Sequence, residues 1–386
     1  MRPMEAAFTE EEHRERLARA RLAIAQKGYD CCICVAPEHI YYLAGYDAHT
    51  HFGAQAFVFT PGDDEPTLVI RDFDLTLAAD TSWVRDVRLF NAGTDDPVEL
   101  MAAVAREKGL ANGIVGIDLQ TFALPGALAL SLVSALAPAR VDDCSDVLGN
   151  LRMVKSEQEM VYVRQAATYA NVGLKTAREV LRPGATESEA AGRIECAMRQ
   201  AGGDYSAMPV FLASGPRAVS NHATFSNRRI EKGDLVHVDF SGVARRYHVD
   251  TMRTLSMGLP GDRVRQIYSS CLESLRAGLA AVHPGAVAGD IARAALEPLE
   301  REHLKGMTPT GRFGYGLSAA YPPSWIDPLS ITPESQQVLM PGMVLLLHQA
   351  FQFPYERLGV IIGGTYALTD NGLEVLSGGD FELEVV

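Results

Sequence analysis

The N-terminal part of the chain alternates between amphipathic and strand-like patterns. Thr9 and Glu12 form a capping box ahead of an amphipathic stretch that predicts a helix to about Lys27. Apolar runs at residues 30–36, 54–60 and 67–70 predict strands. Helical and strand-like patterns go on alternating to about residue 141. This alternation predicts an α/β domain with a mixed sheet over residues 1–150.

The pattern changes near residues 149–150, which we take as the seam between two domains. Ser156 and Glu159 form a second capping box there, at the start of a long helical pattern. Residues 183–185 and 284–286 repeat the tripeptide Pro-Gly-Ala about 100 residues apart, each before an Ala-rich amphipathic stretch. The repeat indicates a faint internal duplication in a second domain over residues 151–386.

Charge and composition limit the classes of binding partner and the cellular compartment that we expect for this protein. The net charge of −13 argues against nucleic acid as a partner. No apolar run approaches the roughly 20 residues that a membrane span needs, and residues 1–16 lack the apolar core of a signal peptide. The six cysteines form neither a disulfide framework nor a complete zinc motif. We therefore expect a cytoplasmic protein without nucleic-acid or membrane partners.

Two similar triplets are the main candidates for chemistry. The sequence His-Val-Asp occurs at residues 237–239 and again at 248–250, on two runs that can pair as strands. Because residues i and i+2 of a strand share a face, His237 and Asp239 should point one way, as should His248 and Asp250. Two adjacent carboxylates need a cation between them, or one keeps its proton. That cation could be a metal ion or a substrate amidinium, guanidinium or ammonium; a solvated surface hairpin is the alternative.

Further candidates follow the second triplet. His348 comes after an apolar run and should lie on a buried strand, either facing a pocket or packed in the core. Tyr321 opens the stretch Tyr-Pro-Pro-Ser-Trp, in which two prolines stiffen a loop and Trp325 offers a flat wall. Such a wall would suit a planar cation, although Trp325 could equally be a core residue.

The second half, most specifically residues 233–258 and 339–372, resembles the pita-bread fold of the aminopeptidase P, methionine aminopeptidase and creatinase family. The resemblance implies an α+β chain in which a creatinase-type α/β N-terminal domain precedes an internally duplicated pita-bread domain. In the metallopeptidases of that family two Asp, one His and two Glu hold two metal ions. Asp239 and Asp250 match the two Asp, and His222 matches a catalytic His upstream of a Lys-Gly-Asp turn.

Three ligand positions of that family are different in this chain. Residues 311–317 read Gly-Arg-Phe-Gly-Tyr-Gly-Leu where the family carries His in G-H-G-x-G-L. His348 stands for the first Glu, and Gly363 and Gly364 stand at the second. A site with two of five ligands is unsuited to a two-metal cluster, so we expect no cofactor. The alternative is a remodelled site in which both Asp and two of His222, His237, His248 and His348 bind one divalent ion.

Within the family, residues 314–325 and 246–248 look most like ectoine hydrolases, which open a cyclic amidine ring. The resemblance implies a metal-independent hydrolase of a C–N bond in a small amidine or guanidine compound. His222 and His348 would relay protons, while Asp239 and Asp250 would hold the cation or activate water. Residues expected to bind substrate are Arg71, His248, Tyr315, Tyr321, Trp325 and Glu356.

Relatives of the creatinase type also imply a homodimer with shared active sites, in which an N-domain Arg such as Arg71 holds a substrate carboxylate. An ion pair of Arg71 with Asp72 or Asp74 is the alternative. Two other functions stay open: a metal-dependent Xaa-Pro aminopeptidase or dipeptidase with a remodelled site, and a non-catalytic binding protein of the same fold.

Overall fold

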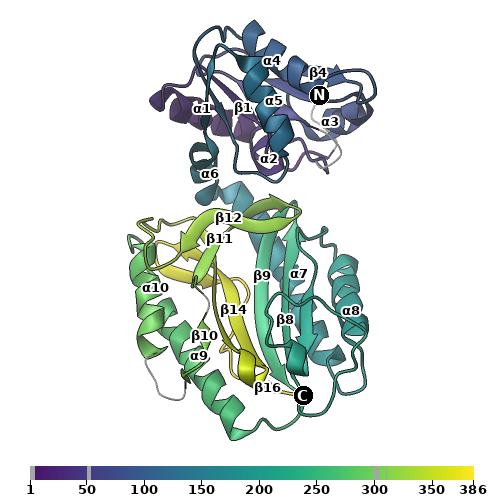
Figure 1. Cartoon of the computed structure of the whole chain (residues 1–386), viewed down its shortest axis with the longest axis vertical. Helices are drawn as coiled ribbons and strands as arrows, with labels where there is room; N and C mark the ends of the chain where they lie inside the picture. The colour runs from purple at the N-terminus through teal and green to yellow at the C-terminus, as the bar shows by residue number, and fades with distance from the viewer. Residues whose placement is uncertain (1–4, 50–53, 300–303, 310) are drawn as a thin grey trace. The chain divides into compact units, whose positions relative to one another are not determined.

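The computed structural model describes the chain except for residues 1–4, 50–53, 300–303 and 310. It divides into two compact units, Met1–Arg152 and Met153–Val386, close to the seam expected at residues 149–150 (Figure 1). Among the described residues, each helix is too short or too polar to cross a bilayer.

The first unit is a mixed sheet of six strands with helices on both faces. The sheet order is β4-β3-β2-β1-β5-β6, and β2 runs antiparallel to both of its neighbours. Its strands are β1 (Cys31–Cys34), β2 (Ala56–Phe59), β3 (Thr67–Arg71), β4 (Asp86–Phe90), β5 (Ile114–Ile117) and β6 (Arg140–Asp143). Its helices are α1 (Glu10–Gln26), α2 (Pro37–Ala44), α3 (Leu75–Thr81), α4 (Pro97–Glu107), α5 (Gly126–Leu136) and α6 (Ser145–Met153), with a 3-10 turn η2 (Asp72–Asp74).

Strand β1 shows why this sheet is apolar on both faces. Cys31 and Ile33 pack into one core with α4 and α5, whereas Cys32 and Cys34 pack into the other with α1 and α2. A strand covered on both faces reads as a continuous apolar run, as the sequence does here. The cysteines are therefore core residues of a mixed α/β domain, as predicted.

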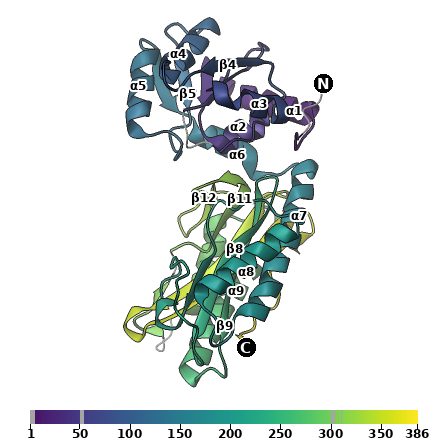
Figure 2. The same ribbon diagram turned by 90° about the vertical axis from the view of Figure 1, so that its right-hand side faces the viewer.

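The second unit is built on one curved, mainly antiparallel sheet, in which only the short β16 pairs parallel to its neighbour among the described strands (Figures 1 and 2). The order of the main strands is β12-β11-β13-β14-β9-β8-β7. These are β7 (Phe211–Ser214), β8 (Leu235–Ala244), β9 (Tyr247–Ser256), β11 (Gly314–Tyr321), β12 (Ser324–Ile331), β13 (Val344–Phe353) and β14 (Leu358–Thr369). The sheet also contains three short strands, β10 (Thr308–Pro309), β15 (Gly372–Val375) and β16 (Glu384–Val385). The unit has three 3-10 turns among its described residues, η3 (Gly215–Arg217), η4 (Glu297–Leu299) and η6 (Pro354–Glu356).

The helices of this unit come in two equivalent pairs. They are α7 (Glu157–Val180) with α8 (Glu187–Gln200), and α9 (Asp262–Ala280) with α10 (Ala288–Leu296). The amide of Gly184, before α8, donates to the Ile230 carbonyl at 2.8 Å, and the amide of Gly285, before α10, donates to the Leu339 carbonyl at 2.8 Å. The same local hydrogen bond at both Pro-Gly-Ala sites supports the duplicated, pita-bread architecture.

Alternate residues of the central strands face the helices or the opposite side of the sheet. Val238 and Phe240 of β8 pack into the core with α7 and α8, so Asp239 points to the opposite face. Leu347 of β13 likewise packs against the α9 side, so His348 points away from it. The helix-free face therefore collects the polar residues of several strands.

The close packing of β8 against α7 depends on the absence of a side chain at Gly242. A Cβ at Gly242 would collide with the main chain of Ala166 and Ala170 in α7, and main-chain atoms cannot rotate away. We expect Gly242→Ala to destabilise the protein by about 2 kcal/mol or more, measured as a lower urea midpoint.

Gly192→Ala on α8 is the matched control, because no atom lies within 4 Å of the added Cβ. That substitution should stabilise the helix by roughly 0.5–1 kcal/mol. Equal effects of the two substitutions would contradict the close strand-to-helix packing.

Candidate functional site

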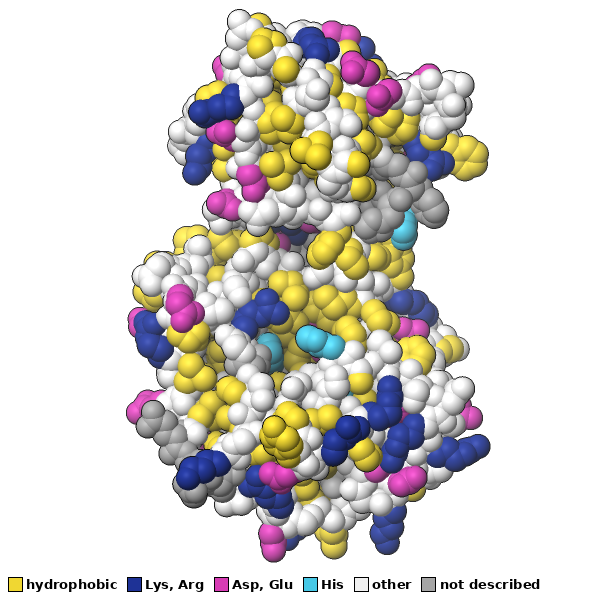
Figure 3. Space-filling view, viewed as in Figure 1, with side chains coloured by type: hydrophobic (Ala, Val, Ile, Leu, Met, Phe, Trp, Pro, Cys, Tyr) yellow, Lys and Arg dark blue, Asp and Glu magenta, His cyan; other side chains and the backbone are white. Residues whose placement is uncertain are grey.

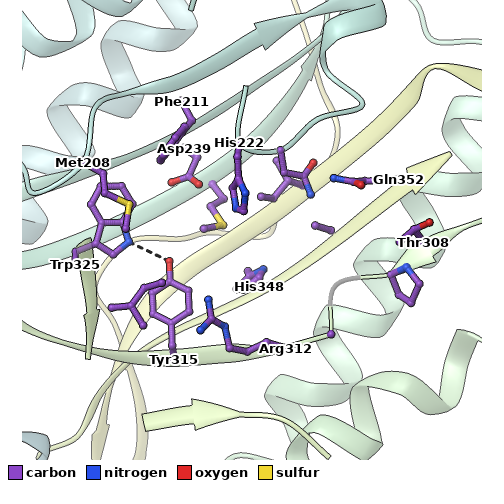
Figure 4. Close-up of a pocket in the computed structure, with 17 residues that line it drawn as sticks. Met208, Phe211, His222, Asp239, Thr308, Arg312, Tyr315, Trp325, His348 and Gln352 are labelled. Atoms are coloured by element: carbon purple, nitrogen blue, oxygen red, sulfur yellow. Dashed lines mark hydrogen bonds between the residues drawn. The ribbon is translucent and has the colours of Figure 1, made fainter. Parts of the chain in front are cut away.

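A cavity of about 660 Å³ opens on the helix-free face of the second unit. Figure 3 shows this face hollowed, with histidine side chains in the hollow. Its walls come from β7 to β14 and from the loops beside these strands (Figure 4). Of the residues predicted from the sequence, the cavity brings together His222, Asp239, Tyr315, Trp325 and His348. Asp250 joins them through Tyr315.

The two carboxylates lie on the paired strands β8 and β9, as the triplets predicted. Asp239 is 4% exposed and Asp250 is fully buried. Thr365 and Ser377 fix the main chain of Asp250, since both hydroxyls donate to its carbonyl oxygen. Among the described residues, Oδ1 of Asp239 and Oδ1 of Asp250 have no hydrogen-bond partner. Each carboxylate therefore keeps one oxygen that a ligand could use.

Burial and mutual repulsion shift the titration of this pair. Burial, and then the charge of Asp250, raise the pKa of Asp239 well above its usual range. Burial also raises the pKa of Asp250. Without a cation beside it, the pair keeps one proton at a pH where exposed aspartates have lost theirs.

Tyr315 links the carboxylates to the aromatic wall. Its hydroxyl donates to Oδ2 of Asp250 at 3.2 Å and accepts from Nε1 of Trp325 at 3.1 Å (Figure 4). Burial and the charge of Asp250 raise the pKa of Tyr315, so the phenol stays protonated and serves as a donor. Trp325 is buried and lines the cavity.

His348 lines the cavity without a hydrogen-bond partner. It lies on β13 directly opposite Gly363 of β14, and neither ring nitrogen bonds to any described residue. Burial, and then the charge of Arg312, lower the pKa of His348 to about 3. The imidazole is therefore neutral at physiological pH, with one N–H to donate and one nitrogen to accept.

Sequence reasoning missed Arg312. It lies in the glycine-rich stretch that was interpreted only as the loss of a histidine ligand. Arg312 lines the cavity, and its guanidinium carbon lies 4.6 Å from the centre of the Tyr315 ring. A positive residue in the stretch that has lost a metal ligand was the signal that could have identified it.

His222 reaches the cavity on a loop that Glu187 holds. Its ring centre is 6.0 Å from that of Phe211, and its side chain is exposed. Glu187 is buried on α8 and accepts hydrogen bonds from the amides of Ser214 (2.8 Å) and Ser226 (2.9 Å), on either side of His222. Both serine hydroxyls and Arg217 donate to it as well. Burial alone would raise the pKa of Glu187, but these donors hold it below the usual value.

Two predicted substrate-binding residues are used elsewhere in the fold. The Nε2 atom of His248 accepts from the amide of Ala207 at 3.0 Å, and Nδ1 lies 2.7 Å from the carbonyl of Arg246. His248 therefore has both nitrogens satisfied and does not line the cavity. Glu356 is half-exposed and forms a two-point ion pair with Arg263, also outside the cavity lining.

The remaining two predicted residues do not line the cavity either. Tyr321 is buried at the end of β11, and its ring lies 5.5 Å from the guanidinium of Arg246. Arg71 belongs to the first unit, where its Nε lies 4.0 Å from Asp74 and its guanidinium lies near Phe73. The ion pair considered from the sequence is thus present.

The donors in the cavity do not fit a two-metal cluster. In the described part of the chain, no three His, Cys, Asp or Glu side chains are arranged to hold a metal ion. Gly363 faces the cavity side of β14, yet a Cβ there would collide with Cβ of His348. A carboxylate at that position would need His348 to move, so the two differences from the family's ligand set depend on each other.

Comparison with known proteins places these features in context. Residues 161–370 match the metallopeptidase family M24, and residues 16–154 match the creatinase/prolidase N-terminal domain. The ectoine hydrolase of Halomonas elongata is 27% identical, with 96% of each chain covered. The Xaa-Pro dipeptidase of Pyrococcus furiosus is 25% identical, with 96% of this chain and 99% of the relative covered. The structure of dipeptidase PepE from Mycobacterium ulcerans superposes with a TM-score of 0.83 at 29% identity, over 98% of this chain and 99% of its own.

Asp250→Asn should change how stability depends on pH. The raised pKa values mean that the folded protein keeps a proton that the unfolded chain releases above about pH 4. This contribution is present at low pH and is lost as the pH rises through the folded-state values. The wild type should therefore lose stability relative to the variant by up to about 1.4 kcal/mol per pH unit.

Urea unfolding at about pH 5 and about pH 8 measures this difference. Asp262→Asn is the control, because that carboxylate is exposed at the start of α9. Parallel pH profiles of the wild type and Asp250→Asn would contradict the shared proton.

Glu187→Gln should loosen the loop that carries His222. Glutamine keeps the shape but loses the charge, and charge-assisted hydrogen bonds contribute about 2 kcal/mol. We expect the amides of Ser214 and Ser226 to exchange with deuterium roughly tenfold faster or more.

Glu189→Gln is the matched control on the same helix, since Glu189 caps only the start of α8 at Thr186. The positioning role of Glu187 fails if both variants leave the two amides equally protected.

Proposed function

Because this chain belongs to the metallopeptidase family M24, a family of hydrolases, we propose that it hydrolyses a C–N bond of a small amidine without a metal ion. A cyclic amidine of the ectoine type is the proposed substrate. The observation that carries the proposal is the buried pair Asp239 and Asp250, in which one oxygen of each has no hydrogen-bond partner among the described residues and Asp239 lines the cavity with Trp325. Such a pair is suited to the two N–H groups of an amidinium.

The cation replaces the proton that the pair otherwise keeps. An amidinium beside Asp239 and Asp250 favours the ionised form of both carboxylates, so its binding expels the shared proton. Asp250, already held by Tyr315, pairs with the amidinium nitrogen. The flat ring of Trp325 covers the planar cation.

Hydrolysis then needs a base for water and an acid for the leaving nitrogen. Asp239 takes a proton from the attacking water, whose oxygen forms a bond with the electrophilic amidinium carbon. His222, held at the cavity by its loop, gives a proton to the ring nitrogen as the C–N bond breaks. The hydroxyl of the tetrahedral intermediate then returns a proton to His222 as it becomes the carbonyl of the product. The products are an amide and a free amine, one water has been consumed, and Asp239 keeps the proton taken from that water.

A dipeptidase is the second candidate. The Xaa-Pro dipeptidase of Pyrococcus furiosus and the ectoine hydrolase of Halomonas elongata are similarly related to this chain. A peptidase of this family would need a remodelled metal site around Asp239 and Asp250. The ligand positions taken by His348 and Gly363 argue against it.

The proposal predicts that the chelator-treated protein consumes ectoine. A proton NMR time course with ectoine, hydroxyectoine, creatine and an X-Pro dipeptide together would measure this. Asp239→Asn should lower kcat by about a hundredfold or more, because general base catalysis is worth that much. Glu356→Gln, in the ion pair outside the cavity, should keep full activity.

Three other results would redirect the assignment. Consumption of creatine alone would keep the metal-free chemistry and change the substrate. Turnover of the dipeptide only after Mn or Zn is added would establish the remodelled metal site. No consumption under any condition would contradict the hydrolase proposal and favour a binding role.

A further inference from the structure

The polar groups of the cavity differ in charge from one side to the other. The carboxylate of Asp239 lies on one side, and the guanidinium of Arg312 lies on the other (Figure 4). Asp250 is fully buried and its carboxylate interacts with that of Asp239. Tyr315 connects the two sides. Its hydroxyl bonds to Asp250, its ring face lies 4.6 Å from the Arg312 guanidinium, and its ring centre is 5.9 Å from that of His348.

We propose that Arg312 and His348 form a subsite for a carboxylate of the substrate, so that the cavity selects small zwitterions. The other end of the zwitterion would be the cation on Asp239 and Asp250, a choice that rests on the function proposed above. The inference thus assigns the substrate carboxylate to two residues of the second unit. Arg71 of the first unit, the residue expected from the sequence, is not needed for it.

The donors of this subsite point to an anionic ligand. His348 is 7% exposed and faces the cavity, and neither of its ring nitrogens has a partner among the described residues. A buried neutral imidazole needs an acceptor for its N–H. Arg312 beside it makes an anionic acceptor favourable, because a guanidinium and an N–H together bind a carboxylate through charge-assisted hydrogen bonds.

The charge balance of the cavity leads to the same class of ligand. Relatives carry a ligand His in the stretch that here reads 311–317 and contains Arg312, and His348 and the glycines at 363 and 364 stand where relatives have two Glu. Two negative charges are thus absent and one positive charge is present. The remaining carboxylate pair and Arg312 leave the cavity suited to one positive and one negative group of the ligand at once.

The size of the site favours a compact zwitterion. Asp250 and Arg312 both contact the same tyrosine, one at its hydroxyl and the other at its ring face. The two charged groups of the ligand must therefore lie about one aromatic ring apart. A cyclic amidine with a carboxylate on its ring meets that condition.

The first test uses acetate as the probe and does not depend on turnover. Acetate titrated into the full-length protein should shift the His348 ring signals in NMR spectra, assigned by their loss in His348→Gln. Arg312→Gln should require roughly tenfold more acetate or greater for the same shift. Arg312→Lys, which keeps the charge but not the planar fork, should lie between the two.

Arg71→Gln and Arg263→Gln are the matched controls and should behave as the wild type. The carboxylate subsite is refuted if acetate leaves His348 unshifted in the wild type, or if Arg312→Gln responds as the wild type does. It is equally refuted if Arg71→Gln, rather than Arg312→Gln, loses the response. A thermal midpoint for each variant shows that the fold is intact.

The second test compares ectoine with its descarboxy analogue, the same methylated cyclic amidine without the carboxylate. The wild type should favour ectoine in kcat/KM by roughly tenfold or more, and Arg312→Gln should remove the preference by raising KM for ectoine alone. Unchanged selectivity in an active Arg312→Gln variant overturns the subsite but leaves the hydrolase. Acetate binding at His348 without turnover of either amidine supports the subsite and overturns the proposed function.

Discussion

Two buried carboxylates on adjacent strands are the constraint on which the rest of the candidate site depends. Asp239 and Asp250 lie on adjacent strands with their main chains fixed by the sheet, and in the case of Asp250 by Thr365 and Ser377. Burial makes two negative charges at that distance costly, so the site must contain either a shared proton or a cation. The aromatic side chains and hydrogen-bond donors of the cavity surround the group that compensates these charges.

In the metallopeptidases of this family, two metal ions compensate the charge of this carboxylate pair. Three further side chains complete the coordination of the metals. Here the stretch that has lost the His contains Arg312, and His348 and Gly363 stand where the two Glu would be. The last two are coupled by sterics, since His348 occupies the space into which a side chain at 363 would project. Arg312 adds a positive charge close to the former metal position, which disfavours a divalent cation there. The same scaffold thus becomes suited to an organic cation.

Much of the candidate site could be predicted from the sequence, because alternation along a strand determines which side chains share a face. The two His-Val-Asp triplets fixed which side chains share a face, and the structure brings both Asp together as expected. The same logic predicted that His348 would lie on a buried strand. The repeated Pro-Gly-Ala turns predicted the duplicated unit, because a tight turn before a helix leaves a local signature.

What the sequence could not show depends on contacts between distant segments. His248 has the correct face but is bonded to Ala207 and Arg246, and Glu356 is paired with Arg263, 93 residues away in the chain. Glu187 of α8 orders the loop of His222 by accepting hydrogen bonds from the amides of Ser214 and Ser226, which are also distant from it in the sequence. Arg312 was visible as a substitution, but its stacking on Tyr315 gave it a role only in three dimensions.

The most direct measurement of the central claim is calorimetric titration of ectoine into the chelator-treated protein, repeated in buffers of different ionisation enthalpy. If an organic cation replaces the proton of the carboxylate pair, binding near neutral pH should release about one proton, and Asp250→Asn should release a smaller fraction because the repulsion between the two carboxylates is gone. Binding without proton release, or binding that appears only after a divalent metal is added, would contradict the account.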